Sequence, residues 1–154
     1  MTTLAYEDDI HVWTLSQIEW LRQGQWGNLD IQHLIEELES MAGRDRRELE
    51  SHFIILIAHL LKWEYQFHQL TDRWHSWQGG SWQGTIIEQR AQLAKLLRKV
   101  PSLKRYLVEA VAEAYPDAVN IAVKETKLSR STFPLSCPYT IEQLLDEDFW
   151  PASH

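Results

Sequence analysis

Histidine and carboxylate side chains recur at helical spacing in two stretches of the chain. The residues concerned are His33, Glu36, Glu37, Glu39, His52 and His59. Helical bundles bind metal ions through such side chains when these face inward. A helical wheel that places the apolar stripe of Ile31, Leu34, Ile35, Leu38 and Met41 inward turns His33 and Glu36 roughly 150° away, toward solvent. We therefore interpret residues 33–39 as an acidic helix surface, and we predict no metal site and no cofactor.

A file of polar residues runs along the most apolar stretch of the sequence. His52, His59 and Gln66 follow one another at intervals of seven residues, on the border of an apolar face. A histidine at such a border is usually a hydrogen-bonded packing residue. The alternative is that His59 lines a pocket with Glu37 or Glu39 from the preceding helix. A carboxylate there would raise the pKa of the imidazole and allow acid–base or metal chemistry.

Basic residues crowd the second half of the chain. They are Arg90, Lys95, Arg98, Lys99, Lys104 and Arg105, with a smaller group at Arg44, Arg46 and Arg47. Such a patch beside tryptophans is typical of single-stranded nucleic-acid binding. The formal charge of -7 argues against that function, and Arg98 and Lys99 are also explained by the helix dipole. Nucleic-acid contact through this patch stays a third hypothesis.

Eight tryptophans are the unusual feature of the composition. Residues 69–84 lack helical periodicity and contain three glycines with Trp74, Trp77 and Trp82, so we predict a loop. Tryptophan is enriched where proteins bind one another. Trp74 and Trp77 are our candidate interaction surface, whereas Trp63 is expected in the core and Trp82 at the start of the next helix.

Signatures of known catalytic machinery are missing from the sequence. It has no glycine-rich phosphate loop, no nucleophile elbow, no zinc-protease motif and no paired CxxC. The one cysteine, Cys137, has no obvious basic neighbour and reads as structural. Whether the protein is an enzyme is therefore left open.

The elements that position these residues are predicted to be helices. The expected ranges are 6–22, 28–41, 48–68, 81–100 and 102–127, with one short helix at 140–145 and a C-terminal tail that wraps the others. Gly43 either separates the second and third helices or lies inside one long helix. Pro116 is expected to bend the fifth helix or to begin a new one. The predicted fold class is all-α, a compact single-domain helical bundle over residues 1–154.

Length and composition suit this fold. A chain of 154 residues can bury a sizeable core without disulfides, and the longest apolar run is too short to cross a bilayer. The first ten residues are acidic and polar, unlike a signal peptide. We therefore expect a cytoplasmic protein with no membrane partner.

Several short motifs, in order, resemble a bacterial family known as domain of unknown function family twenty-nine. They are YEDDI, LRQGQW, LDIQHLIEELESM, HLLKWEYQ, SWQGTIIEQR, PSL, AYPDA, KETKL and FPLSCPYTIEQLLDEDFWP, and they span residues 6–151. The resemblance implies a compact helical protein with no established catalytic residues. The matching motif positions are Glu36, Glu37, His59, Lys62, Trp63, Ser81, Trp82, Arg90, Tyr115, Glu125 and Thr126.

Two functions from different classes follow. The first is a protein–protein interaction or regulatory module, whose partner is a second copy or another protein. The second is a small-ligand-binding protein or enzyme whose polar pocket is formed by Glu37, His59, Trp82 and Arg90, because a carboxylate, a histidine and an arginine at an apolar wall are typical of functional pockets.

Overall fold

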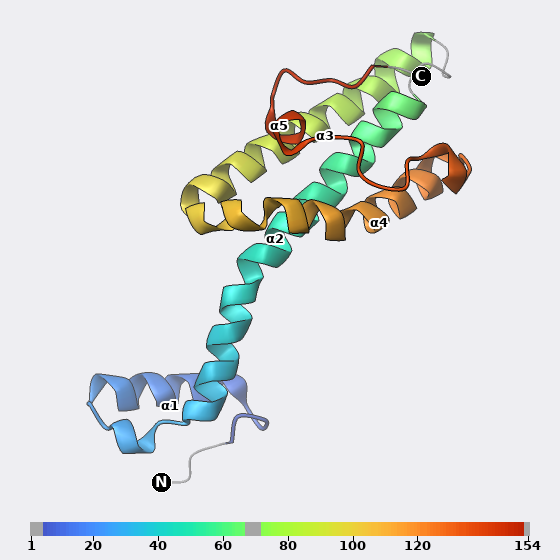
Figure 1. The fold of residues 1–154 in the computed structure, drawn as a ribbon. Coiled ribbons are helices and arrows are strands. Elements are labelled where there is room, and N and C mark those ends of the chain that lie inside the picture. Colours follow the sequence, from blue (N-terminus) through green and yellow to red (C-terminus); the bar gives the residue numbers. More distant parts are fainter. Residues whose placement is uncertain (1–4, 67–71, 153–154) are drawn as a thin grey trace. The chain divides into compact units, whose positions relative to one another are not determined.

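The described part of the chain is helical, as predicted. The computed structural model describes the backbone of residues 5–66 and 72–152 and the side chains of residues 5–66 and 81–152, and within these ranges it contains no strand. The elements are α1 (Ile10–Arg22), η1 (Trp26–Asn28), α2 (Ile31–Tyr65), α3 (Asp72–Lys99), η3 (Pro101–Tyr106), α4 (Leu107–Thr126), η4 (Arg130–Thr132) and α5 (Ile141–Leu145). Figure 1 shows their order.

The chain forms two compact units, Met1–Gly43 and Arg44–His154, which we call unit 1 and unit 2 and describe separately. Helix α2 contributes to both, because it continues through Gly43. Of the two alternatives for this glycine, the single long helix is therefore the observed one. That residues 1–154 behave as a single domain stays a prediction.

The core of unit 2 is built on the second half of α2. Leu49, Phe53, Leu56 and Leu60 recur in the sequence at steps of four and three, the spacing of one helix face, and all four are fully buried. Ile57, Ala58 and Leu61 on the neighbouring face are fully buried too, so this part of α2 is enclosed by other elements. Those elements are α3, the segment Pro101–Tyr106, α4 and the C-terminal segment, which supply the rest of one apolar cluster.

The predicted loop at residues 69–84 is wrong over most of its length. Helix α3 begins at Asp72 and runs through Gly79, Gly80 and Gly84, whereas residues 67–71 lie outside the described part of the chain. Each glycine weakens a helix by about 1 kcal/mol relative to alanine. The burial of Trp82 and Ile86, one helical turn apart, is tertiary packing that favours the helix in spite of this cost.

The region expected as a fifth helix from residue 102 contains two elements. Residues Pro101–Tyr106 form the 3₁₀ helix η3, and α4 then runs from Leu107 without a break through Pro116. The alternative of a new helix beginning at Pro116 is therefore wrong. The proline is exposed, so its ring lies on the outer side of α4.

The C-terminal segment contains the short helix that the sequence predicts. Thr140 and Gln143 have the spacing of a capping box in the sequence, and the structure contains it: the Thr140 side chain caps α5, and the Gln143 side chain accepts from the Thr140 amide. Arg90 of α3 secures this segment. Its guanidinium donates hydrogen bonds to the carbonyl oxygens of Leu144, Phe149 and Gln143 at 2.9, 2.8 and 3.0 Å.

Unit 1 is held together by polar side chains. Asp9 caps α1, which begins at Ile10 and not at Tyr6 as expected, by accepting a hydrogen bond from the Val12 amide at 3.1 Å. The Trp13 indole donates to Asp30 at 3.0 Å, and the Asp30 amide donates to the buried side chain of Gln17 at 2.8 Å. Helix α1 is thereby joined to the start of α2 (Figure 1).

The first turns of α2 present to α1 the face that was expected in solvent. His33 stacks on the Tyr6 ring with centroids 4.2 Å apart and bonds Asp30 at 2.7 Å, and the Tyr6 hydroxyl donates to Glu37. The predicted orientation of this helix is therefore wrong. The physical reason is that Tyr6, Trp13 and Gln17 offer polar partners, and these satisfy the hydrogen-bonding groups of the polar face.

Candidate functional site

An exposed apolar surface distinguishes unit 1 from unit 2. Among the described residues, ten of the fourteen large apolar side chains that are exposed belong to unit 1. They are Ile10, Val12, Leu15, Ile18, Leu21, Trp26, Ile31, Ile35, Leu38 and Met41. Trp13 is the one buried apolar side chain in the described part of this unit. Ten exposed large apolar side chains within 43 residues are an unusual concentration for one small unit.

The most regular part of this surface lies on α2. Ile31, Ile35, Leu38 and Met41 are 55, 49, 61 and 54% exposed, and we call these four residues the outer stripe. At 100° per residue the first three fall within about 60° of one another, which is the pattern of a helix that packs against a second helix. The stripe extends over about 16 Å of helix, or three turns.

Carboxylates border the outer stripe. On the same wheel Glu39 and Glu36 follow Ile31 at about 80° and 140°, and both are exposed. Glu37 lies on the other side and accepts the hydrogen bond from Tyr6. That hydrogen bond raises the pKa of Tyr6 to about 12.

The net formal charge of the protein is carried by unit 1. Residues 1–43 contain eight carboxylate side chains and one arginine, a formal charge of -7, whereas residues 44–154 contain fourteen of each sign. The acidic residues of unit 1 are Glu7, Asp8, Asp9, Glu19, Asp30, Glu36, Glu37 and Glu39. The exposed apolar side chains of unit 1 therefore lie in the part of the chain that carries the excess of negative charge.

A second group of interest is a buried lysine in unit 2. Lys62 is 5% exposed and forms an ion pair with Glu125 of α4. Its Nζ lies 3.4 Å from Nε2 of His59 and 5.2 Å from the centroid of the Trp82 ring. We call these four residues the Lys62 cluster. They come from the motifs HLLKW, SWQG and KET, which the tertiary structure brings together.

The tautomer of His59 follows from its contacts. Nδ1 lies 2.9 Å from the Ile55 carbonyl oxygen and donates to it, so Nε2 carries the lone pair that accepts from Lys62. Burial, and next the charge of Lys62, hold the pKa of His59 below its usual value. A neutral imidazole beside an ammonium and a half-exposed carboxylate has the chemistry of a proton-transfer group.

The predicted polar pocket consists of Glu37, His59, Trp82 and Arg90, and two of these four residues belong to the Lys62 cluster. His59 and Trp82 both contact Lys62. Arg90 instead uses its guanidinium on the carbonyl groups of residues 143–149, and Glu37 belongs to unit 1, where it pairs with Tyr6. A pocket that joins all four residues stays a prediction.

The rest of the polar file links α2 to its neighbours. His52 Nδ1 lies 2.7 Å from the Gln89 side chain of α3, and the Gln66 side chain donates to the Thr126 carbonyl at 3.0 Å. His52 and Gln66 therefore have the hydrogen bonds to neighbouring elements that are expected of packing residues. Among the described residues no group of three or more histidine, cysteine or acidic side chains is arranged to hold a metal ion.

The remaining candidates are placed as follows. Trp74 and Trp77 fall in the first turns of α3, and their side chains lie outside the described residues. Trp82 is buried. Arg98 and Lys99 end α3, and Lys104 and Arg105 follow in η3. Contact of this basic segment with nucleic acid stays a prediction.

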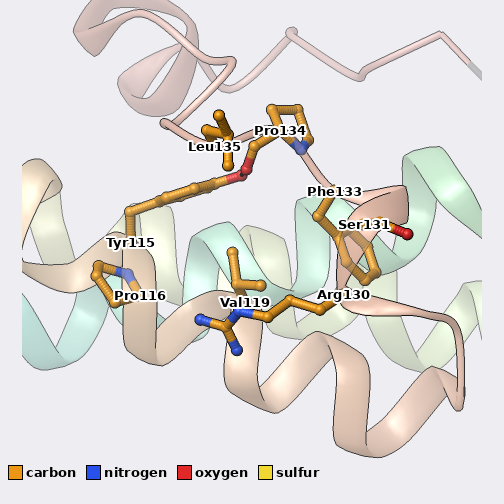
Figure 2. A pocket seen from close by; sticks show the side chains of 8 residues that line it. All are labelled: Tyr115, Pro116, Val119, Arg130, Ser131, Phe133, Pro134 and Leu135. Carbon is orange, nitrogen blue, oxygen red and sulfur yellow. Dashed lines mark hydrogen bonds between the residues drawn. The ribbon is translucent and has the colours of Figure 1, made fainter.

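A shallow hollow of about 480 Å³ lies on unit 2 between α4 and residues 130–135 (Figure 2). Tyr115 closes one side by donating its hydroxyl proton to the Pro134 carbonyl at 2.6 Å. Leu135 overhangs it and is fully exposed, and Arg130 bonds the Asn120 side chain. The polar groups that line it are engaged within the fold, so we assign it no ligand.

Two of these features, the solvent exposure of the outer stripe and the Lys62 cluster, were not predicted from the sequence. The outer stripe was identified as apolar but was expected inside the molecule. The Lys62 cluster was missed because Lys62 and its ion-pair partner Glu125 are 63 residues apart along the chain. The available signal was that the resemblance covers His59, Lys62, Trp82 and Glu125 together.

The fold and these surfaces define an all-helical protein with an acidic N-terminal unit that exposes apolar side chains. Residues 5–150 match the family described as Domain of unknown function DUF29, so the chain belongs to that family and the predicted resemblance is confirmed. No curated protein and no solved structure matches it. In the described residues no helix has the length and apolar character needed to span a membrane.

Proposed function

We propose that the protein is a protein-binding module that uses unit 1 to hold a partner. The observation that carries this proposal is the outer stripe, four apolar side chains in helical register that are each about half exposed. Burying such side chains against a partner stabilises a complex by about 25 cal/mol per Å² of apolar surface. The absence of a predicted catalytic motif is compatible with a binding role.

Photo-crosslinking tests this proposal. A photoreactive amino acid replaces Leu38 in one variant and Val108 in a matched control, because both are well exposed on helices and Val108 lies in unit 2. The variants are expressed in the source cells and irradiated. We expect a discrete crosslinked species from position 38 and none from position 108. Equal or absent crosslinking from both positions would contradict a binding role for unit 1.

A second candidate function rests on the Lys62 cluster. A buried ammonium with a neutral imidazole 3.4 Å away and an indole ring 5.2 Å away could hold a small anionic or aromatic ligand, and we propose this as the site's role. We propose to test it by following the His59 imidazole resonance during titration with mixtures of metabolites. A ligand that shifts this resonance in the native protein, and does so less in Glu125→Gln, supports the site. If none of the mixtures shifts the His59 resonance, the proposed ligand site is refuted.

A further inference from the structure

We propose that the partner of unit 1 is a basic amphipathic helix of another protein, which lies along the outer stripe with its lysine or arginine side chains beside Glu36 and Glu39. This inference rests on the proposed binding function and adds the chemistry of the partner. It is carried by two independent observations, the exposure of the stripe and the concentration of the formal charge in residues 1–43.

The geometry of the stripe favours a helix as the occupant. Its apolar residues recur at intervals of four and three, which is how one helix presents itself to another. The exposed side chains of Glu36 and Glu39 follow on one border of the stripe. A partner helix therefore needs an apolar face and cationic residues along one edge of that face, where they meet these carboxylates.

Charge argues against a second copy as the occupant. Two copies of unit 1 in contact would bring together two groups of formal charge -7. Unit 2, with fourteen residues of each sign, contributes no net charge to offset this. Like charges across an interface disfavour that pairing, whereas a cationic helix is attracted to the same surface. Anionic membranes and nucleic acids are disfavoured for the same reason.

The test uses the full-length protein and three synthetic peptides of about 18 residues, or five helical turns. The first has a leucine face and a lysine face. The second replaces each lysine with glutamate. The third has the composition of the first in an order that destroys the apolar face. Binding is measured by fluorescence anisotropy of the labelled peptide at several salt concentrations.

We expect only the lysine peptide with an intact apolar face to bind, with an affinity that falls as salt screens the charges. Glu39→Lys should weaken this binding about five- to tenfold at low salt, because it replaces attraction with repulsion. Glu88→Lys is the matched control, since Glu88 is an exposed glutamate on α3 of unit 2, and it should leave the affinity unchanged. Leu38→Gln should weaken binding at every salt concentration.

Three results would overturn the inference. They are equal binding of the lysine and glutamate peptides, no binding of either, and equal effects of Glu39→Lys and Glu88→Lys. A concentration-dependent dimer that buries position 38 would replace the basic helix with a second copy. None of these results removes the crosslink expected from position 38, so failure of the partner chemistry is distinguishable from failure of the binding function.

Discussion

Individual side chains in this protein hold elements together through polar contacts that are specific in direction. Arg90, which is 4% exposed, is the clearest case. Its guanidinium donates hydrogen bonds to three carbonyl groups of the C-terminal segment and lies 5.7 Å from the centroid of the Trp150 ring. Burial lowers the pKa of Arg90, so the hydrogen bonds must compensate for its lost hydration.

Replacing Arg90 should release this segment. We expect Arg90→Ala to lower the free energy of unfolding by about 3–5 kcal/mol, because three hydrogen bonds from a charged donor are lost and buried carbonyl groups are left unsatisfied. Urea unfolding followed by tryptophan fluorescence measures the change. Arg98→Ala, an exposed arginine on the same helix, should change it by less than about 1 kcal/mol. Similar losses in both variants would refute the anchoring role.

His33 in unit 1 and His59 in the Lys62 cluster should have pKa values on opposite sides of the usual histidine pKa. The hydrogen bond to Asp30 raises the pKa of His33, whereas burial lowers the pKa of His59. The contribution of His33 to stability is therefore present at low pH and lost as the pH rises through its raised pKa. That of His59 is present at neutral pH and lost as the pH falls through its lowered pKa.

NMR titration of the imidazole signals checks these directions. In Lys62→Met the pKa of His59 should rise toward its usual value, because a positive charge 3.4 Å away is removed. His33 lies in unit 1 and serves as the internal control, with an unchanged titration. Identical pKa values for the two histidines in the native protein would argue against the observed environments.

At the scale of elements, α2 contains two helical segments with different surroundings. Between Leu49 and Leu61 its apolar stripes are buried as the periodicity predicts. Between Ile31 and Met41 an equally regular stripe is exposed, because the polar face is the one that pairs with α1. Periodicity identifies an apolar face, but the direction of that face depends on what the neighbouring element offers.

Helix α4 allows a test of the cost of a helical proline. Pro116 removes one amide donor from an exposed position of a helix that is otherwise continuous. We expect Pro116→Ala to raise the free energy of unfolding by about 1–2 kcal/mol, since the restored hydrogen bond outweighs the added freedom of the unfolded chain. Thermal and urea unfolding measure this. A loss of stability would indicate that the bend expected at Pro116 is required for packing.

At the scale of the whole molecule, formal charge and exposed apolar surface are both concentrated in the first 43 residues. Repulsion between like charges opposes the association of such surfaces with one another. The remaining residues carry most of the buried core. Under the proposed function, binding and stability therefore belong to different parts of the sequence.

If charge repulsion prevents self-association, neutralising it should permit association. We expect the native protein to sediment mainly as a monomer at low salt, and Glu36→Gln with Glu39→Gln to associate as concentration rises, because the outer stripe is retained while its flanking charge is removed. Sedimentation velocity measures both species. Adding Leu38→Gln to the double variant should restore the monomer, and a stable native dimer at low salt would contradict this account.

The sequence by itself determined the all-helical class, the family, the buried stripes of α2 after Leu49 and the capping box at Thr140. Each depends on local periodicity, on short-range hydrogen bonding or on ordered motifs, which one chain segment displays without its neighbours. Only the tertiary structure decided that residues 72–84 are helical, that the outer stripe faces solvent and that Lys62 meets Glu125. These depend on contacts between distant segments, where the burial of tryptophan and the pairing of polar groups outweigh local preference.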